Sequence, residues 1–237
     1  MINVGLLPEG AGNAGVVTGR DLQAWNLNVY RAAWRALTDV RPIGPGSRVL
    51  EIGCGQGVGL RYLADQSQAS VTGVDLSIVA TLLARRAGLA VRRASTHALP
   101  FADASFDAVF MIEALFVFAG WARALPEVRR VLTPGGHLVT AEFTSMTIDE
   151  ARNAVAQRAE AAGFSLVALD DHSSDARRAV LEGEAARARY LRNVPRPIAV
   201  HFRDALGLKG SERYASWQQS RQSYYIATLR AVQGPKR

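Results

Sequence analysis

The sequence has a single cysteine, no long apolar run and no basic amino-terminal start. One thiol, Cys54, excludes an internal disulfide and leaves no second thiol for a metal cluster, so we expect a small buried side chain and no metal site. No apolar run approaches the ~18 to 20 residues needed to cross a bilayer. The start, MINVGLLPEG, also lacks the long apolar centre of a secretory signal. These absences predict a soluble, cytoplasmic protein without a transmembrane segment.

Acidic residues are outnumbered only in the last third of the chain. The net charge is +7, but residues 1–150 carry 13 basic and 13 acidic side chains, and residues 151–237 carry 15 and 8. We favour solvated helix faces as the explanation; an anionic substrate or membrane surface comes second. Nucleic acid comes third and is not expected as a partner, because no aromatic residues interleave with the charges to stack on bases.

Strand and helix patterns alternate along the chain, after a glycine-rich lead-in over residues 1–20 and a helical pattern over 21–40. Strands are predicted at residues 48–52, 70–76, 90–94, 106–112, 137–143, 164–169 and 224–232. Helices are predicted at residues 59–65, 78–87, 122–132 and 148–162. Such alternation is typical of a mainly parallel sheet covered on both faces, which binds ligands at the carboxyl ends of its strands.

In the last third of the chain, from residue 173 on, helical patterns follow one another without strands between them. A polar helix is predicted over residues 173–194, followed by helical pieces around 200–206 and 211–222. If the last strand joins the sheet, residues 173–222 form an insertion that could roof the ligand cleft. We divide the chain into a lead and lid helix (1–44), a core (45–172), a helical lid (173–222) and a final strand and tail (223–237).

One motif predicts a nucleotide-type ligand. The strand sequence VLEI, which contains Glu51, leads directly into Gly53, Gly55 and Gly57. Glycines let the backbone approach a ligand closely, and the following helix presents free N–H groups. Asp75 ends the next strand, where a carboxylate can accept hydrogen bonds from the two hydroxyls of a ribose.

Three further segments follow in order: LPFADASFDAVFMIEAL at residues 99–115, RVLTPGGHLV at 130–139, and Glu142 with Phe143. With them the chain resembles the small-molecule branch of the class I S-adenosylmethionine-dependent methyltransferases, over about residues 45–170. The resemblance implies an α/β fold with a Rossmann-like, seven-stranded, mostly parallel sheet, helices on both faces and a helical lid inserted before the last strand. It also implies S-adenosyl-L-methionine as cofactor and S-adenosyl-L-homocysteine as product.

The resemblance assigns cofactor-binding roles by position. Gly53, Gly55 and Gly57 would line the methionine half with the help of Glu51. Asp75 would bind the ribose and Leu76 would pack on the adenine, although Asp75 could instead only cap the next helix.

Other positions depart from the family pattern. Relatives carry an Asp for the adenine amino group where this chain has Ser95, so recognition falls to Ser95, Thr96 or His97. Met111, Ile112 and Glu113 would run past the sulfonium, and Glu113 could equally be a carboxylate without a ligand. Near the start, WNLNVYR resembles an element that folds over the cofactor. Its Trp25 and Tyr30 would close over the methionine end or only pack the helix.

A hydroxyl acceptor needs alignment with the methyl donor and benefits from a nearby base. Natural-product members of the family often carry a His shortly after the acidic residue, but here Phe116, Val117 and Phe118 follow Glu113 instead. The segment LDDHSS resembles the family element that precedes the lid helix. It makes Asp171 our first choice as base or acceptor-orienting residue, and His172 our second, with helix capping as the alternative.

Together these features predict a methyltransferase acting on a hydroxyl of a hydrophobic secondary metabolite or lipid. The alternatives are N- or C-methylation of a small molecule, a cofactor-binding cyclase that transfers no methyl group, and, third, a nucleic-acid methyltransferase. The acceptor, the atom methylated and the oligomeric state, a homodimer included, stay open.

Overall fold

The computed structural model describes residues 5–8, 16–114, 121–192, 194, 203–204 and 206–232, without the side chain of Tyr190. The apolar segment predicted at Phe116, Val117 and Phe118 lies outside these residues, as does most of the helical piece predicted around 200–206. The limits of the four predicted units stay predictions.

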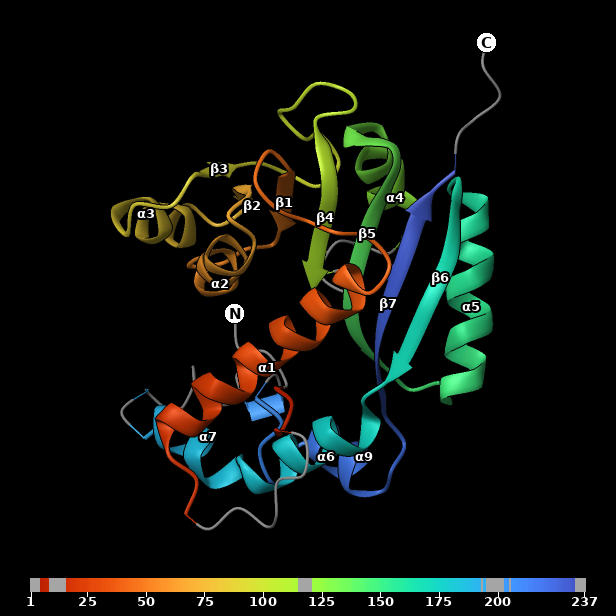
Figure 1. The fold of residues 1–237 in the computed structure, drawn as a ribbon. Helices are drawn as coiled ribbons and strands as arrows, with labels where there is room; N and C mark the ends of the chain where they lie inside the picture. The colour runs from red at the N-terminus through yellow and green to blue at the C-terminus, as the bar shows by residue number, and fades with distance from the viewer. Residues whose placement is uncertain are drawn as a thin grey trace.

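A seven-stranded sheet runs through the molecule in the order β3-β2-β1-β4-β5-β7-β6 (Figure 1). The first five strands pair in parallel, and β7 lies antiparallel between β5 and β6. This confirms the predicted mostly parallel sheet and the last strand's place in it. The strands are β1 (Arg48–Ile52), β2 (Ser70–Asp75), β3 (Val91–Arg93), β4 (Phe106–Ile112), β5 (Leu132–Thr144), β6 (Phe164–Asp171) and β7 (Ser223–Ala231).

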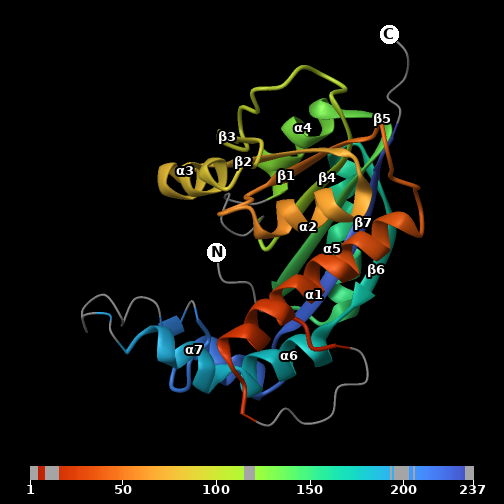
Figure 2. The same ribbon diagram turned by 60° about the vertical axis from the view of Figure 1, so that its left-hand side comes forward.

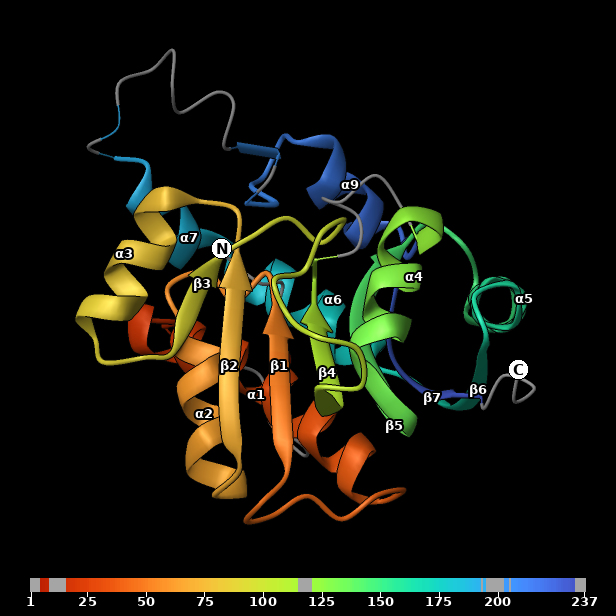
Figure 3. The same cartoon turned by 90° about the horizontal axis from the view of Figure 1, so that it is seen from above.

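Helices cover both faces of the sheet (Figure 3), because alternate residues of each strand point to opposite sides. In β1, Leu50 and Ile52 join the core formed with α4 and α5, whereas Val49 joins the core under α1. The helices are α1 (Gly19–Thr38), α2 (Val58–Ser67), α3 (Ile78–Arg86), α4 (Trp121–Val131), α5 (Ile148–Ala161), α6 (Ser173–Glu182), α7 (Glu184–Tyr190) and α9 (Glu212–Gln218).

Helices α6, α7 and α9 belong to the segment between β6 and β7, and they lie with α1 at the carboxyl ends of the parallel strands (Figure 1). Helix α1 contacts α2, β5, β7 and α7, so it links the core to this group (Figure 2). A capping box between Thr18 and Asp21 fixes the start of α1. These helices cover the carboxyl ends of the strands, where ligands of α/β proteins bind.

The single helix predicted over residues 173–194 is two helices, because the chain turns at Gly183. A Cβ atom at this position would lie 2.7 Å from the Ala179 carbonyl oxygen and 2.8 Å from Leu22 of α1. The buried guanidinium of Arg187 donates to the carbonyl oxygens of Ala179, Val180 and Leu206, which ties α6 and α7 together.

Candidate functional site

The glycine-rich loop leaves β1 and enters α2 in a backbone conformation that favours glycine. Gly53, Gly55 and Gly57 have φ angles of 76°, 54° and 83°, all in the left-handed region. Gly57 is also the N-cap of α2 and provides no side-chain cap. The first N–H groups of α2 are therefore available to an anionic group of a ligand.

Asp75 connects this loop to the end of β2. Its Oδ2 accepts from the Gly55 N–H at 2.8 Å and its Oδ1 from the Ser77 N–H at 2.8 Å. Each carboxylate oxygen has a further lone pair, so both can also accept from ribose hydroxyls. The next side chain, Leu76, is 54% exposed and free to meet a flat apolar ring.

Tyr30 and Glu51 form a buried pair behind the loop. The Tyr30 hydroxyl donates to Glu51 Oε1 at 2.7 Å. Burial raises the pKa of Glu51 to about 7, while the Tyr30 hydrogen bond opposes this shift. Within the described residues, the buried Oε2 atom of Glu51 has no hydrogen-bond partner. An unsatisfied buried carboxylate oxygen is costly for a protein, and a donor group on a ligand would satisfy it.

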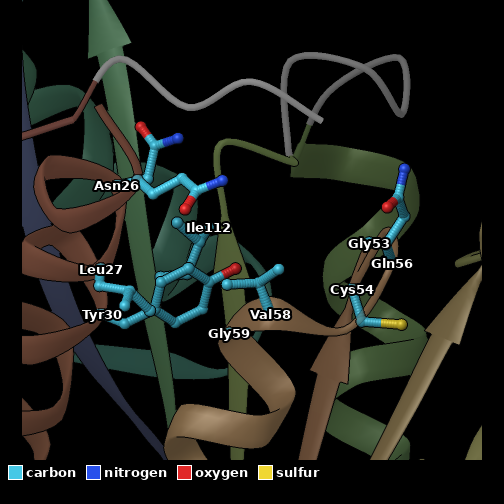
Figure 4. Close-up of a pocket in the computed structure, with 10 residues that line it drawn as sticks. Asn26, Leu27, Tyr30, Gly53, Cys54, Gln56, Val58, Gly59 and Ile112 are labelled. Carbon is cyan, nitrogen blue, oxygen red and sulfur yellow. The ribbon is translucent and has the colours of Figure 1, made fainter. Parts of the chain in front are cut away.

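A cavity of about 430 Å³ lies between α1 and the glycine loop (Figure 4). This volume falls in the usual range for small-molecule sites. It is lined by Gln23, Asn26, Leu27, Tyr30, Gly53, Cys54, Gln56, Val58, Gly59 and Ile112. Sequence reasoning missed most of these residues, although the four from α1 recur at positions i, i+3, i+4 and i+7, which mark one helix face.

Gly59 decides how closely α1 approaches α2. A Cβ atom there would lie 2.0 Å from Cε1 and Cζ of Tyr30, which no side chain tolerates. The absence of a side chain at this position therefore lets Tyr30 reach Glu51.

The candidates for adenine recognition follow β3. Thr96 is 1% exposed, and its hydroxyl has no hydrogen-bond partner in the part of the chain that the structure describes. Ser95 Oγ accepts from the His97 N–H at 3.2 Å, and the His97 side chain is exposed. Of the three, Thr96 combines burial with unused hydrogen-bonding capacity.

The residues predicted to run past the sulfonium, at the end of β4, have different surroundings. The Met111 side chain packs in the core with α4 and α5, whereas its neighbour Ile112 lines the cavity. Glu113 is buried in the left-handed region, with a φ of 49°, which is strained for a residue other than glycine. Its Oε1 accepts from the hydroxyl of Tyr224 at 2.9 Å. Burial, followed by the charge of Glu113, raises the pKa of Tyr224 well above its ordinary value.

The structure does not bring Asp171 and His172 into the same cavity as the glycine loop. Asp171 ends β6, and its Oδ1 accepts from both the N–H and the hydroxyl of Ser173. It lines a separate polar cavity of about 800 Å³ with residues of α6 and α9. His172 lines a third cavity, of about 220 Å³, beside Arg31 and Arg35 of α1. The catalytic roles of both residues stay predictions.

Among the residues that the structure describes, no group of three or more His, Cys, Asp or Glu side chains could hold a metal ion. No helix in this part of the chain is long and apolar enough to span a membrane.

The residues that contact the glycine loop or end the strands beside it fit S-adenosylmethionine. Asp75 has lone pairs for a ribose, Leu76 offers an exposed apolar contact, and the unsatisfied oxygen of Glu51 suits a donor such as an ammonium group. Adenine contacts would come from the segment that holds Thr96.

Comparison with known proteins gives the same result. The family model described as "Methyltransferase domain" matches residues 50–140. The 27-O-demethylrifamycin SV methyltransferase of Amycolatopsis mediterranei is 30% identical over 190 residues, which cover 69% of this chain and 70% of that protein. A phthiotriol/phenolphthiotriol dimycocerosates methyltransferase of Mycobacterium ulcerans is 43% identical over 99 residues, which cover 40% of this chain and 36% of that protein.

The matched regions span less than half the length of the first three curated relatives, 36 to 44%. Among solved structures, the cyclase SpnF superposes with a TM-score of 0.77 over 99% of this chain and 88% of that one. At 22% identity this similarity shows the fold alone. The relative from Amycolatopsis mediterranei shows the family, because it is 30% identical and 70% of its length is covered. The chain belongs to the class I S-adenosylmethionine-dependent methyltransferases.

Proposed function

We propose that this protein transfers a methyl group from S-adenosylmethionine to a hydroxyl of a hydrophobic small molecule, such as a secondary metabolite or a lipid. The observation that carries the proposal is the cavity bounded by the glycine loop, with Asp75 bonded to the Gly55 N–H and Glu51 held by Tyr30. The relatives add support through their names, since one acts at an oxygen of a rifamycin and another on a dimycocerosate lipid.

The bound cofactor supplies an activated methyl group on its sulfonium. The chain's own residues position that group and exclude water. Asp75 would hold the ribose, and Glu51, oriented by Tyr30, would accept a hydrogen bond from the methionine ammonium. The α1 side chains over the cavity would limit the access of water, as an in-line displacement requires.

Asp171 is proposed as the residue that orients the acceptor hydroxyl or takes its proton, with His172 as second choice. Asp171 lies in a polar cavity lined by hydroxyl groups and by Arg177. A carboxylate within reach of a hydroxyl acceptor can act as a general base.

The test is to incubate the protein with methyl-labelled S-adenosylmethionine and an organic extract of source cells lacking the gene, with RNA in a parallel tube. We expect the label in a single organic-soluble compound whose new methyl group is on oxygen. A label on nitrogen or carbon would replace O-methylation by the corresponding alternative, and label in RNA would overturn the proposal.

A cyclase without methyl transfer is the second candidate, favoured by the structural similarity to SpnF over nearly the whole chain. It predicts conversion of the acceptor without release of S-adenosylhomocysteine, which mass spectrometry of the reaction measures directly. A cytoplasmic location and a homodimer are further predictions, tested by cell fractionation and by light scattering.

A further inference from the structure

Helix α3 exposes its large apolar side chains and buries its small ones. Ile78, Val79, Leu82 and Leu83 are 53%, 67%, 48% and 41% exposed, whereas the buried residues of the helix are Thr81 and Ala84. Helical periodicity places the four large side chains on one side and the two buried residues on the other. We call these four residues the α3 face. A cluster of exposed aliphatic side chains on one helix is typical of an interaction site.

The chain segment that carries the α3 face is basic. Residues 76–102 contain no Asp or Glu and four arginines, Arg85, Arg86, Arg92 and Arg93, all exposed. Arg86 follows Val79, Leu82 and Leu83 by seven, four and three positions, so it lies among the apolar side chains.

Two of the other three arginines are held beside this surface. Arg85 donates to the Val91 carbonyl oxygen and Arg93 to that of Leu76. These contacts leave the positive charges of Arg85 and Arg93 beside the α3 face. Arg92 points to the opposite side of β3 from Val91 and lies over the ring of Phe101, 5.0 Å from its centroid, so it is not part of this surface.

This surface lies at the β3 edge of the sheet, where α3 packs against β2 and β3 (Figures 1 and 3). Helix α3 begins three residues after Asp75, so the surface adjoins the proposed ribose site. A partner bound there would lie beside the proposed ribose site.

We propose that the α3 face, with Arg85, Arg86 and Arg93, forms a docking surface for an anionic lipid bilayer. The aliphatic side chains enter the boundary between headgroups and acyl chains, and the arginines meet lipid phosphates. Nucleic acid fits less well, because its bases stack on aromatic rings and the α3 face has none. A second copy related by two-fold symmetry would bring arginines against arginines, which costs free energy.

Docking is tested by sedimenting the full chain with vesicles, in the absence of cofactor and acceptor. One vesicle type is pure phosphatidylcholine; the other mixes seven parts phosphatidylcholine with three parts phosphatidylglycerol. We expect at least about tenfold tighter binding to the mixed vesicles, lost at high salt, because each arginine near an anionic surface contributes about fivefold.

Two variants separate the apolar from the electrostatic contribution. Val79→Asn with Leu82→Asn, and Arg86→Gln alone, should each weaken binding several-fold. Their controls are Val16→Asn, which alters a valine that is 85% exposed elsewhere, and Arg20→Gln on α1; both should bind like the unaltered chain. Thermal unfolding verifies that every variant is folded.

Equal binding to both vesicle types, or binding to neither, would overturn the proposal. So would a dimer in light scattering that the Val79 and Leu82 changes dissociate, or RNA binding that Arg86→Gln abolishes. Since no assay uses cofactor or acceptor, a failed methyl-transfer experiment leaves this result untouched, and a failed vesicle experiment leaves the proposed function untouched.

Discussion

Four carboxylates of this protein differ in what their surroundings let them do. Asp75 is half-buried and organises two backbone N–H groups while it keeps lone pairs for a ligand. Glu51 and Glu113 are buried, and each accepts a hydrogen bond from a tyrosine hydroxyl. Asp171 is exposed, ends β6 and accepts from the N–H of Ser173, the first residue of α6. Burial and hydrogen bonding therefore suit the first three for positioning and leave Asp171 accessible to an acceptor.

Asp75→Ala should weaken S-adenosylmethionine binding by at least about tenfold, because a hydrogen bond to a charged group contributes roughly 1.5 to 3 kcal/mol. Titration calorimetry measures this loss. The control is Asp65→Ala, which removes an exposed carboxylate of α2. If Asp75→Ala binds the cofactor as tightly as the control, Asp75 only caps the start of α3.

Glu51→Gln should change how stability depends on pH. The folded protein holds the Glu51 proton up to about pH 7, whereas the unfolded chain releases it near the ordinary value of 4.5. Native stability from this group is therefore full below pH 4.5 and is lost as pH rises through 7. A glutamine at this position does not ionise, so the stability of the variant lacks this dependence on pH. Between pH 4.5 and 7, the free energy of unfolding of the variant should therefore rise by on the order of 3 kcal/mol relative to that of the native protein.

Urea unfolding of both proteins at several pH values, without cofactor, measures the difference. Glu160→Gln, at an exposed position of α5, is the matched control and should run parallel to the native protein. Parallel curves for Glu51→Gln would mean that Glu51 ionises normally in the folded state.

Asp171→Asn separates catalysis from helix capping. The amide oxygen can still accept from the Ser173 N–H, so α6 should start as before, but the variant cannot take a proton. We expect turnover to fall at least about tenfold with unchanged cofactor affinity, as for loss of a general base. Unchanged turnover would eliminate Asp171 as the base and leave it as a cap.

At the scale of elements, α1 and the glycine loop that leads into α2 enclose the cavity proposed for the cofactor. The start of α1 is fixed by its capping box and its end by packing on β5 and β7. Tyr30 then crosses over Gly59 to reach Glu51 on β1. The Tyr30 side chain therefore links α1, α2 and β1. The distance between α1 and α2 is sensitive to a single methyl group at position 59.

Gly59→Ala tests this spacing. Alanine is favoured over glycine in a helix by about 1 kcal/mol, but its Cβ would overlap the Tyr30 ring, and such overpacking typically costs about 1 to 3 kcal/mol. We expect a lower melting temperature and weaker cofactor binding, measured by calorimetry. Gly44→Ala is the control, because nothing lies within 4 Å of a Cβ atom there. A stabilised Gly59→Ala protein would show that α1 moves freely over α2.

At the scale of the whole molecule, β7 joins the parallel part of the sheet to its edge strand, β6. It pairs with β5 and β6, and its residues from Tyr224 to Leu229 are at most 4% exposed. It also carries Tyr224, which bonds to Glu113 at the end of β4. The last strand in sequence is therefore an interior strand of the sheet, with β5 on one side and β6 on the other.

A chain that ends after Gln222 should not fold cooperatively, because β6 would lose its partner strand and β5 would expose a buried edge. Calorimetry should detect no cooperative transition for it, whereas a chain that ends after Val232 should unfold like the 237-residue chain. A cooperative transition in the shorter chain would contradict the central role of β7.

The sequence by itself determined the strands, most helices, the glycine loop and Asp75. These features rest on local signals: alternation of apolar residues, glycines where φ is positive, and a carboxylate at a strand end. The ordered segments after them predicted the family. The break at Gly183 was missed because the packing that excludes a side chain there involves Leu22, which belongs to another element.

Only the tertiary structure decided which side chains meet. Tyr30 and Glu51 are 21 residues apart and Tyr224 and Glu113 are 111 apart, so no local pattern relates them. It also assigned Asp171 to a cavity separate from the glycine loop and left the α3 face exposed. The physical reason is that periodicity fixes which side of an element is apolar, whereas long-range packing fixes what that side contacts.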